Sequence, residues 1–147
     1  MERGDIGEFS IAGQACVFDQ LLASSPTNIS DRMKERFHIA KGDWESALKL
    51  WKPNDAPLKS MIDHVKRLGI STVVVTFLSP DAVEPVYRWL LRKGVSTTVE
   101  FYESPAHFGQ DLKYNHSLRN VYVPDQEMSA VLGVRATCVS PTTIWSL

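Results

Sequence analysis

Hydrophobic residues in this chain follow two spacings, and the two alternate from one segment to the next. Residues 70–78 are β-branched or apolar almost throughout, with no charge and no alternation, which is typical of a strand buried on both faces of a parallel sheet. Residues 55–68 and 83–91 instead carry apolar side chains at helical spacing, and Gly69 and Gly94 follow their ends. The pattern therefore predicts a helix, a central strand and a second helix in succession.

Shorter elements continue this alternation along the rest of the chain. Further strands are predicted over residues 14–19, 95–102, 119–125 and 134–139. Short helices are predicted after Ser30-Asp31, after Asp43 and over residues 126–132. The strand over 95–102 alternates in polarity, which favours a sheet edge. The turn-rich residues 103–118 are predicted to form a loop, with room for one helical turn before Lys113. The order predicts an α/β fold: a three-layer αβα sandwich with a mainly parallel, Rossmann-like sheet of about five strands.

Length and composition limit the choice of class and partner. The chain has 147 residues, which suits one domain over residues 14–147 after an N-terminal arm over residues 1–13. Lys+Arg 16 against Asp+Glu 17 gives a net charge of -1, so a nucleic-acid partner would need a local basic groove. The N-terminal residues are too polar for a signal peptide and no apolar run reaches transmembrane length, so we expect a cytoplasmic protein without membrane contact.

Candidate chemistry comes from four polar residues at or after the predicted strands, namely Asp19, Thr76, Lys113 and Asp125. Carboxylates hold Mg²⁺, and a hydroxyl and an ammonium group can take the oxygens of a phosphate ester. Each residue also has an ordinary structural explanation: the two aspartates as caps, the threonine as strand filler and the lysine as a solvated loop residue. Spacing alone leaves both explanations open.

The order of these residues resembles the haloacid dehalogenase superfamily, and within it the compact phosphatase domains similar to the 3′-phosphatase domain of polynucleotide kinase. The corresponding motifs are Val-Phe-Asp-Gln-Leu at residues 17–21, Val-Val-Val-Thr at 73–76, Lys113, and Val-Tyr-Val-Pro-Asp-Gln-Glu at 121–127. The Asp-Trp and Pro-rich stretch over 43–57 and the Trp-Leu-Leu-Arg-Lys-Gly-Val segment over 89–95 also resemble these domains. The resemblance covers residues 14–145.

The resemblance implies a role for each matching position. Asp19 would be the catalytic nucleophile that forms an aspartyl-phosphate, Thr76 would bind the transferring phosphoryl group, and Lys113 would neutralise its charge. Asp19, Asp125 and Glu127 would hold Mg²⁺. These domains normally place a second aspartate two residues after the nucleophile to protonate the leaving group, and here that residue is Leu21, which has no proton to donate.

Three functions stay open, and the last of them is a structural or inhibitory protein whose useful surface lies elsewhere, such as residues 103–118 or the tail around Trp145. The first is a phosphohydrolase of nucleotide or polynucleotide phosphate esters with reduced or altered activity. The alternative is a catalytically inactive domain of the same fold that binds or regulates through protein or nucleic-acid contacts. A phosphorylated nucleotide or nucleic-acid end is the expected small partner, and residues 103–118 or the tail around Trp145 are the expected protein contacts. His107 and His116 flank Lys113 and are candidate substitute acids.

Overall fold

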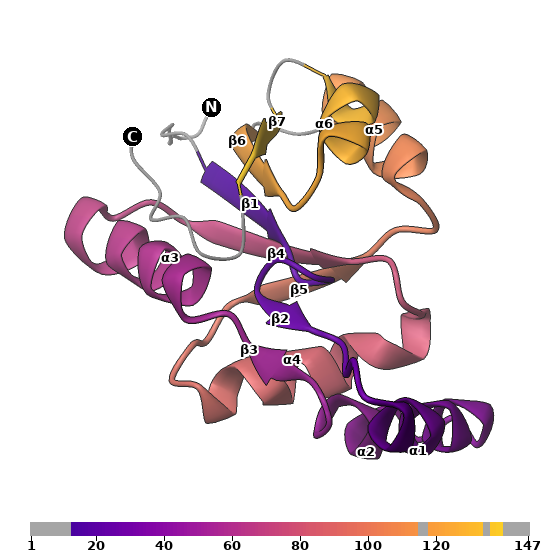
Figure 1. Ribbon diagram of the computed structural model, residues 1–147. Helices are drawn as coiled ribbons and strands as arrows, with labels where there is room; N and C mark the ends of the chain where they lie inside the picture. The colour runs from indigo at the N-terminus through magenta and orange to yellow at the C-terminus, as the bar shows by residue number, and fades with distance from the viewer. Residues whose placement is uncertain (1–12, 115–117, 134–135, 140–147) are drawn as a thin grey trace.

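A five-stranded sheet forms the centre of the computed structural model, which describes residues 13–114, 118–133 and 136–139 (Figure 1). The strands are β1 Gly13–Val17, β4 Thr72–Thr76, β5 Thr98–Phe101, β6 Leu118–Val123 and β7 Ala136–Cys138. Their order is β5-β4-β1-β6-β7, and every neighbouring pair is parallel. The predicted α/β sandwich with a parallel, Rossmann-like sheet is therefore confirmed.

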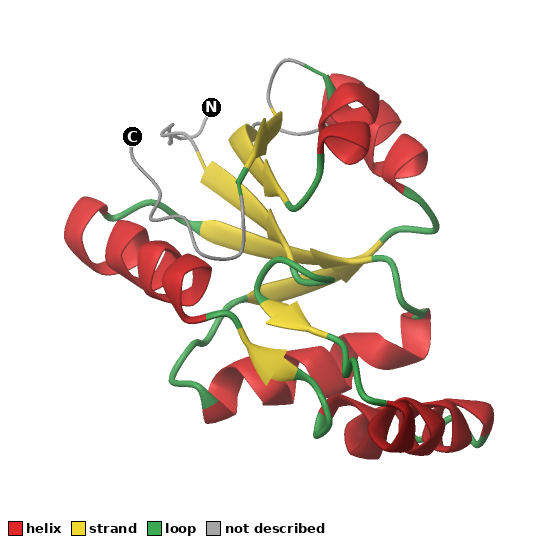
Figure 2. Cartoon of the chain, viewed as in Figure 1, coloured by secondary structure: helices red, strands yellow, loops and turns green. Residues whose placement is uncertain are grey.

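Helices cover both faces of this sheet (Figure 2). The helices are α1 Ile29–Ala40, α2 Trp44–Leu48, α3 Asp55–Leu68, η1 Pro80–Ala82, α4 Val83–Arg92, α5 Pro105–Tyr114 and α6 Gln126–Leu132. Cys16 and Val74 face the core shared with α2, α3 and α4, whereas Val17 and Val75 face the core shared with α5 and α6. Successive side chains of a strand point to opposite faces, so apolar residues in unbroken succession fill both cores.

The register of the strands aligns their carboxyl ends. Cys16 pairs with Val74 of β4 on one side and with Tyr122 of β6 on the other. Strand β1 therefore occupies the middle of the sheet, and the residues that follow β4, β1 and β6 leave the sheet at one edge. Open α/β sheets generally bind ligands at this edge.

Several boundaries differ from the sequence prediction. Residues 105–114 form the helix α5, where a loop with at most one helical turn was predicted. The helix forms because Phe108 and Leu112, one turn apart, both pack into the core between the sheet and α5 and α6. Helix α1 begins one residue before Ser30, since the side chain of Asn28 caps it by accepting from the backbone N–H of Asp31 at 2.9 Å. Strand β5 is shorter than predicted, but it does lie at a sheet edge.

A second, smaller sheet was not predicted. Strands β2 Ala23–Ser24 and β3 Lys52–Pro53 pair antiparallel, and α1 and α2 are inserted between them. Glu45 of α2 accepts hydrogen bonds at 3.0 Å from both Arg88 and Arg92 of α4, which fixes this insertion to the main body. Strand β2, which leads into this insertion, begins four residues after Asp19 and so starts close to the candidate site in the chain.

Two expectations concern parts that the structure describes only incompletely. The predicted arm over residues 1–13 lies outside the described residues except for Gly13, which already belongs to β1. Within the described ranges, none of the helices has the length and hydrophobicity that a membrane span requires.

Candidate functional site

Asp19 follows the central strand β1 by two residues and stands at the carboxyl edge of the sheet. The chain turns tightly there, since the backbone N–H groups of Leu22 and Ala23 both donate to the carbonyl oxygen of Phe18, at 3.2 and 3.3 Å. Gln20, inside this turn, has a φ of 67°, a left-handed backbone conformation that residues other than glycine rarely adopt. The turn directs the Asp19 carboxylate toward the end of the neighbouring strand β4.

Two donors from the end of β4 hold this carboxylate. The Thr76 hydroxyl donates to Asp19 Oδ1 at 2.8 Å, and the backbone N–H of Phe77 donates to Asp19 Oδ2 at 2.9 Å. Thr76 is fully buried, and its Oγ1 accepts from the N–H of Leu78 at 3.2 Å, which fixes the hydroxyl in place. The structure therefore brings together two of the four residues that the sequence singled out.

Burial changes the acidity of Asp19. The loss of solvation raises its pKa from 3.8 to about 6, although the hydrogen bonds from Phe77 and Thr76 oppose the rise. The group is therefore mostly ionised at pH 7 and less well solvated than an ordinary surface carboxylate. A partly desolvated carboxylate held in one orientation is suited to act as a nucleophile or as a base.

Asp125 and Glu127 follow β6, the other neighbour of β1. The exposed Asp125 is the N-cap of α6, since its Oδ1 accepts from the N–H of Met128 at 2.7 Å, and Glu127 lies exposed in the first helical turn. A carboxylate accepts several hydrogen bonds, so capping uses only part of the capacity of Asp125. The structural role predicted for Asp125 as a cap is confirmed, and its position beside the end of β1 is compatible with a second role.

The fit of this edge to Mg²⁺ rests on few ligands. In the described part of the chain, no three His, Cys, Asp or Glu side chains are grouped so that they could hold a metal ion. Mg²⁺ is commonly bound by only one or two carboxylates, with water and phosphate oxygens completing its shell. Asp19, which follows β1, and Asp125, which follows the neighbouring strand β6, are two carboxylates at this edge and make a set of that size.

Lys113 lies away from this edge. Helix α5 starts shortly after the carboxyl end of β5 and ends shortly before β6, whose first residue, Leu118, pairs with Gly13 at the amino end of β1. Lys113 is in the last turn of α5, and its exposed Nζ lies 5.5 Å from the centre of the Tyr114 ring. The structure therefore does not bring Lys113 to the Asp19 edge, and it instead places the lysine toward the opposite end of the sheet.

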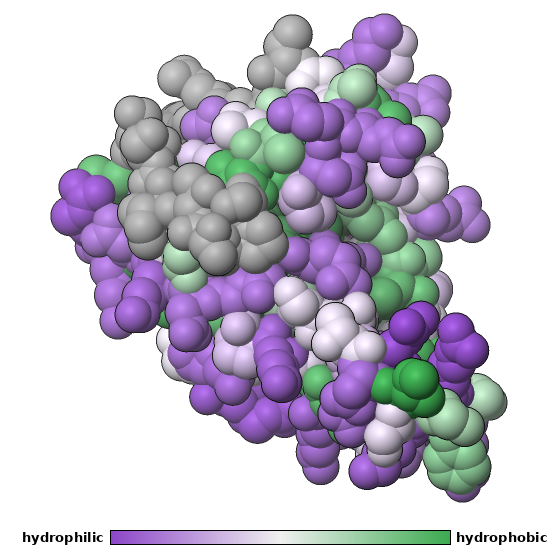
Figure 3. Space-filling view, in the orientation of Figure 1, coloured by the Kyte–Doolittle hydropathy of each residue, from purple (hydrophilic) through white to green (hydrophobic). Residues whose placement is uncertain are grey.

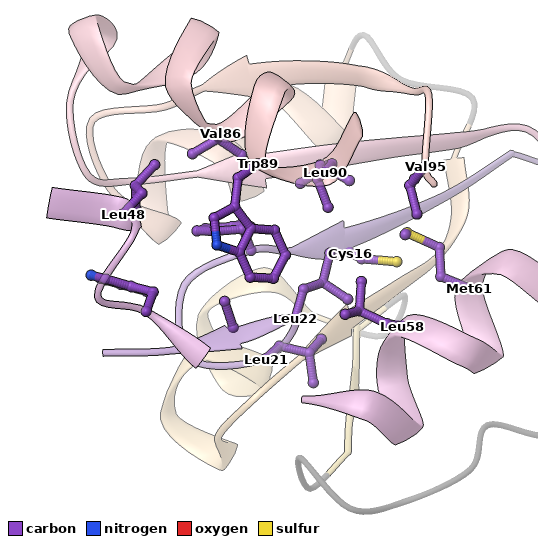
Figure 4. Packing of buried hydrophobic residues seen from close by; sticks show 14 of the residues in the cluster. Cys16, Leu21, Leu22, Leu48, Leu58, Met61, Val86, Trp89, Leu90 and Val95 are labelled. Carbon is purple, nitrogen blue, oxygen red and sulfur yellow. The ribbon is translucent and has the colours of Figure 1, made fainter. Parts of the chain in front are cut away.

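Leu21, which the sequence resemblance places at the general-acid position, is turned away from the edge and into the core. Leu21 is fully buried among Leu22, Leu58 and Trp89, as Figure 4 shows. Even an acidic side chain at this position would therefore enter a hydrophobic cluster instead of reaching the site. Of the two candidate substitute acids, the exposed His107 lies beside the Tyr102 ring at 5.5 Å, and His116 lies outside the described residues.

Asn54 is a contributor that the sequence did not reveal. It occupies the N-cap position of α3 but makes no capping hydrogen bond with its side chain. Its Nδ2 instead donates to the Leu21 carbonyl oxygen at 2.8 Å, its Oδ1 accepts from the Ser24 hydroxyl at 3.0 Å, and its backbone N–H donates to the Leu22 carbonyl oxygen at 2.9 Å. Asn54 thus holds the segment that follows Asp19. An asparagine before a helix usually signals a cap, so the pattern gave no indication of this contact.

We expect Asn54→Asp to lower the free energy of unfolding by about 1–3 kcal/mol, because it leaves the Leu21 carbonyl oxygen without its donor. Urea denaturation at pH 7 measures the change. Aspartate is as good an N-cap as asparagine and suits the positive end of the helix dipole, so a residue that only capped α3 would tolerate this substitution. An unchanged or increased stability would therefore contradict the assigned contact.

Two of the larger hollows in the described structure lie elsewhere. One of about 420 Å³ and one of about 460 Å³ both include residues 96–98, which lead into the amino end of β5. They are away from Asp19, and their linings contain no group of residues that resembles a catalytic set. The Asp19 edge is thus distinguished by its hydrogen bonds and by the strand order.

The comparisons add no relative to this description. When the chain is compared with family models, with curated proteins and with solved structures, no significant match is found in any of the three.

Proposed function

We propose that this chain is a phosphohydrolase of the haloacid dehalogenase type that transfers a phosphoryl group from a nucleotide or polynucleotide phosphate ester to Asp19. One observation carries the proposal: the Asp19 carboxylate at the end of the central parallel strand is held by the Thr76 hydroxyl and the Phe77 N–H. The resemblance implies that the first two motifs meet at one edge of the sheet, and the proposal is supported by the parallel pairing of β1, which precedes Asp19, with β4, which ends at Thr76. A cytoplasmic setting is also proposed, and it agrees with the two free cysteines, Cys16 and Cys138.

In the proposed reaction, an oxygen of Asp19 forms a bond to phosphorus while the bond from phosphorus to the leaving oxygen breaks. The leaving oxygen then takes a proton from water, and a second water attacks the phosphorus, which releases inorganic phosphate and restores the carboxylate. Thr76 and the Phe77 N–H orient the carboxylate throughout. Mg²⁺, when bound by Asp19 and Asp125 with help from Glu127, would neutralise charge on the phosphoryl oxygens.

The buried Leu21 predicts the kind of substrate that reacts fastest. General acid catalysis is typically worth about 10²–10⁴-fold, and a domain without the acid loses that factor for leaving groups of high pKa. An aryl phosphate has a leaving group that departs without protonation and is much less affected. The proposed activity is therefore low on a 3′-phosphorylated oligonucleotide and higher on an activated ester.

The test is turnover with Mg²⁺ of 4-nitrophenyl phosphate and of a 3′-phosphorylated oligonucleotide. We expect slow turnover of the aryl ester that falls by at least about 100-fold in Asp19→Asn, because the amide cannot act as the nucleophile. Asp63→Asn is the matched control, since Asp63 is exposed on α3 and pairs with Arg67 at 2.9 Å. Equal turnover in the wild type and in Asp19→Asn would overturn the assignment of the nucleophile.

The second candidate is a domain that binds a phosphate group, or a partner, without turnover. The burial of Leu21 favours it, since the position of the acid has become part of the core. Beryllium fluoride, which mimics a phosphoryl group on an aspartate, is the probe. A rise in melting temperature with Mg²⁺ and beryllium fluoride that is lost in Asp19→Asn, without turnover of either ester, would select this candidate. If neither turnover nor a rise is seen, the phosphohydrolase and the phosphate-binding domain both fail.

The protein contacts expected from the sequence now have a different structural context. Most of residues 103–118 belong to helix α5, and Trp145 lies outside the described residues. Neither segment adds support to either candidate.

A further inference from the structure

Helix α1 carries its largest apolar side chains on the outside. Ile29, Met33 and Phe37 are 75%, 66% and 58% exposed, and α1 has no buried residue. Their spacing of four residues places them along one ridge of the helix. A surface helix normally turns such a stripe toward the core, so this ridge lacks the partner that its composition calls for among the described residues.

The orientation of α1 is fixed by contacts on its inner side. Glu35 accepts a hydrogen bond from the indole N–H of Trp51, and Ile39 packs against the core between the sheet and α2, α3 and α4. The Nδ1 of His38 lies 3.8 Å from Oδ2 of Asp43. The side-chain oxygen of Asn28 caps the start of the helix by accepting from the Asp31 N–H, and the Asn28 side-chain amide in turn donates to Asp31 Oδ2 at 2.9 Å. The helix is therefore anchored by its polar residues, and the ridge faces outward as a consequence.

Positive charge flanks the ridge on both sides. At 100° per residue, Arg32 and Arg36 lie on one side of the ridge and Lys34 lies on the other, while Lys41, the C-cap residue, continues the ridge past Phe37. The Lys41 Nζ lies 4.4 Å from the centre of the Phe37 ring. A hollow of about 120 Å³ is lined by Ile29, Arg32, Met33 and Arg36. Figure 3 shows hydrophobic atoms beside hydrophilic ones over this part of the molecule, at lower right.

The acidic residues of α1, Asp31 and Glu35, lie on the opposite side of the helix from the ridge at 100° per residue, and Glu35 faces inward to Trp51. The outer face of α1 therefore combines an apolar ridge with two basic borders. We define it by Ile29, Arg32, Met33, Lys34, Arg36, Phe37 and Lys41 and name it the α1 outer face.

We propose that the α1 outer face binds an acidic amphipathic helix of a partner protein. A ridge of side chains four residues apart packs into the groove between the corresponding rows of a second helix. Acidic residues bordering the apolar stripe of that helix would meet Arg32 and Arg36 on one side, Lys34 on the other, and Lys41 at the end of the ridge. Binding would bury the three apolar side chains, and removing their surface from water favours the complex.

Other occupants fit these observations less well. A second copy of α1 would bring basic borders against basic borders, and like charges so placed oppose association. Nucleic acid would satisfy the charges but leave Ile29 and Met33 in contact with a charged backbone. A bilayer would accept the ridge, but three large side chains on one short helix give it little apolar area to insert.

The probe is a synthetic amphipathic helix with Leu at heptad positions a and d and Glu at e and g, used at concentrations at which it is monomeric. Titration with fluorescence anisotropy gives the Kd. We expect saturable binding that weakens as the salt concentration rises, and a Kd at least about tenfold weaker for Met33→Ser/Phe37→Ser. Val131→Ser is the matched control, since Val131 is 50% exposed on α6, and it should leave the Kd unchanged.

A charge exchange tests the borders separately. We expect a peptide with Lys at e and g to bind weakly to the wild type and at least about tenfold more tightly to Arg32→Glu/Arg36→Glu. No binding of the acidic peptide, or equal binding of both peptides, would overturn the proposal. Tighter binding to anionic vesicles than to the acidic peptide would assign the face to a membrane instead. Dimerisation of the wild type that Met33→Ser/Phe37→Ser abolishes would assign it to a second copy.

Discussion

Asp19→Asn is expected to increase the free energy of unfolding at pH 8 by up to about 3 kcal/mol, and to change it little at pH 4. The reason is the raised pKa of Asp19, about 6 against 3.8 for an unperturbed aspartate. A group with a raised folded pKa contributes stability that is present below its unfolded pKa and is lost as the pH rises through its folded pKa. For Asp19 this loss falls between about pH 4 and pH 6, and a tenfold change in its acid dissociation constant corresponds to about 1.4 kcal/mol.

The amide at this position keeps the hydrogen bonds without the charge. Its oxygen can accept from the Phe77 N–H, and its NH₂ group can donate to the Thr76 hydroxyl, which rotates to suit. Urea denaturation of both proteins at pH 4 and pH 8 measures the effect, and the difference between them isolates Asp19 because the other groups titrate alike in both.

Asp63→Asn supplies the opposite sign as a control. The hydrogen bond from Arg67 lowers the pKa of Asp63, so its stabilising contribution is present at high pH and is lost as the pH falls. The Asp63→Asn substitution should slightly lower the free energy of unfolding at pH 8. A difference between Asp19→Asn and the wild type that stays constant with pH would show that the Asp19 carboxylate carries no such cost. A residue that destabilises the fold in its ionised form, and is retained, is a candidate for function.

The elements predicted best are those whose pattern of apolar residues is compatible with only one place in the fold. Residues 70–78 lack charge and alternation, and β4 does lie inside the sheet with helices on both faces. Helix α5 was missed because Phe108 and Leu112 are its only buried residues, too few to establish a period. Strands β2 and β3 have two residues each, which is too short for any periodic signal.

The candidate site was partly predictable for a related reason. Asp19 and Thr76 each follow or end a strand that the pattern identifies, and neighbouring parallel strands bring their carboxyl ends together. The position of Lys113 depended on an unpredicted helix, whose length carries the lysine toward the other end of the sheet. The hydrogen bonds from the Phe77 N–H and from Asn54 to a backbone carbonyl involve main-chain groups that every residue type has. The sequence therefore could not predict them.

Phe18→Ala is expected to lower the free energy of unfolding by about 3–5 kcal/mol, which is a large part of the stability of a domain of this size. Phe18 is fully buried between two indoles, stacked on Trp51 with ring centres 5.7 Å apart and edge-on to Trp89 at 5.2 Å. The substitution removes both contacts and leaves a cavity that the two large rings can fill only by moving. Urea denaturation at pH 7 gives the change.

The matched variant is Phe18→Leu, which keeps much of the volume and should cost clearly less than Phe18→Ala. The site makes this comparison informative, because the Phe18 carbonyl oxygen accepts both N–H groups that form the turn around Asp19. If the aromatic contacts hold that turn in place, the Phe18→Leu variant also loses turnover of an aryl phosphate while remaining folded. A loss of less than about 1 kcal/mol in Phe18→Ala would contradict the packing, since full burial of a phenylalanine is worth more than that. Unchanged turnover in Phe18→Leu would show instead that the residue before Asp19 supports the fold without orienting the carboxylate.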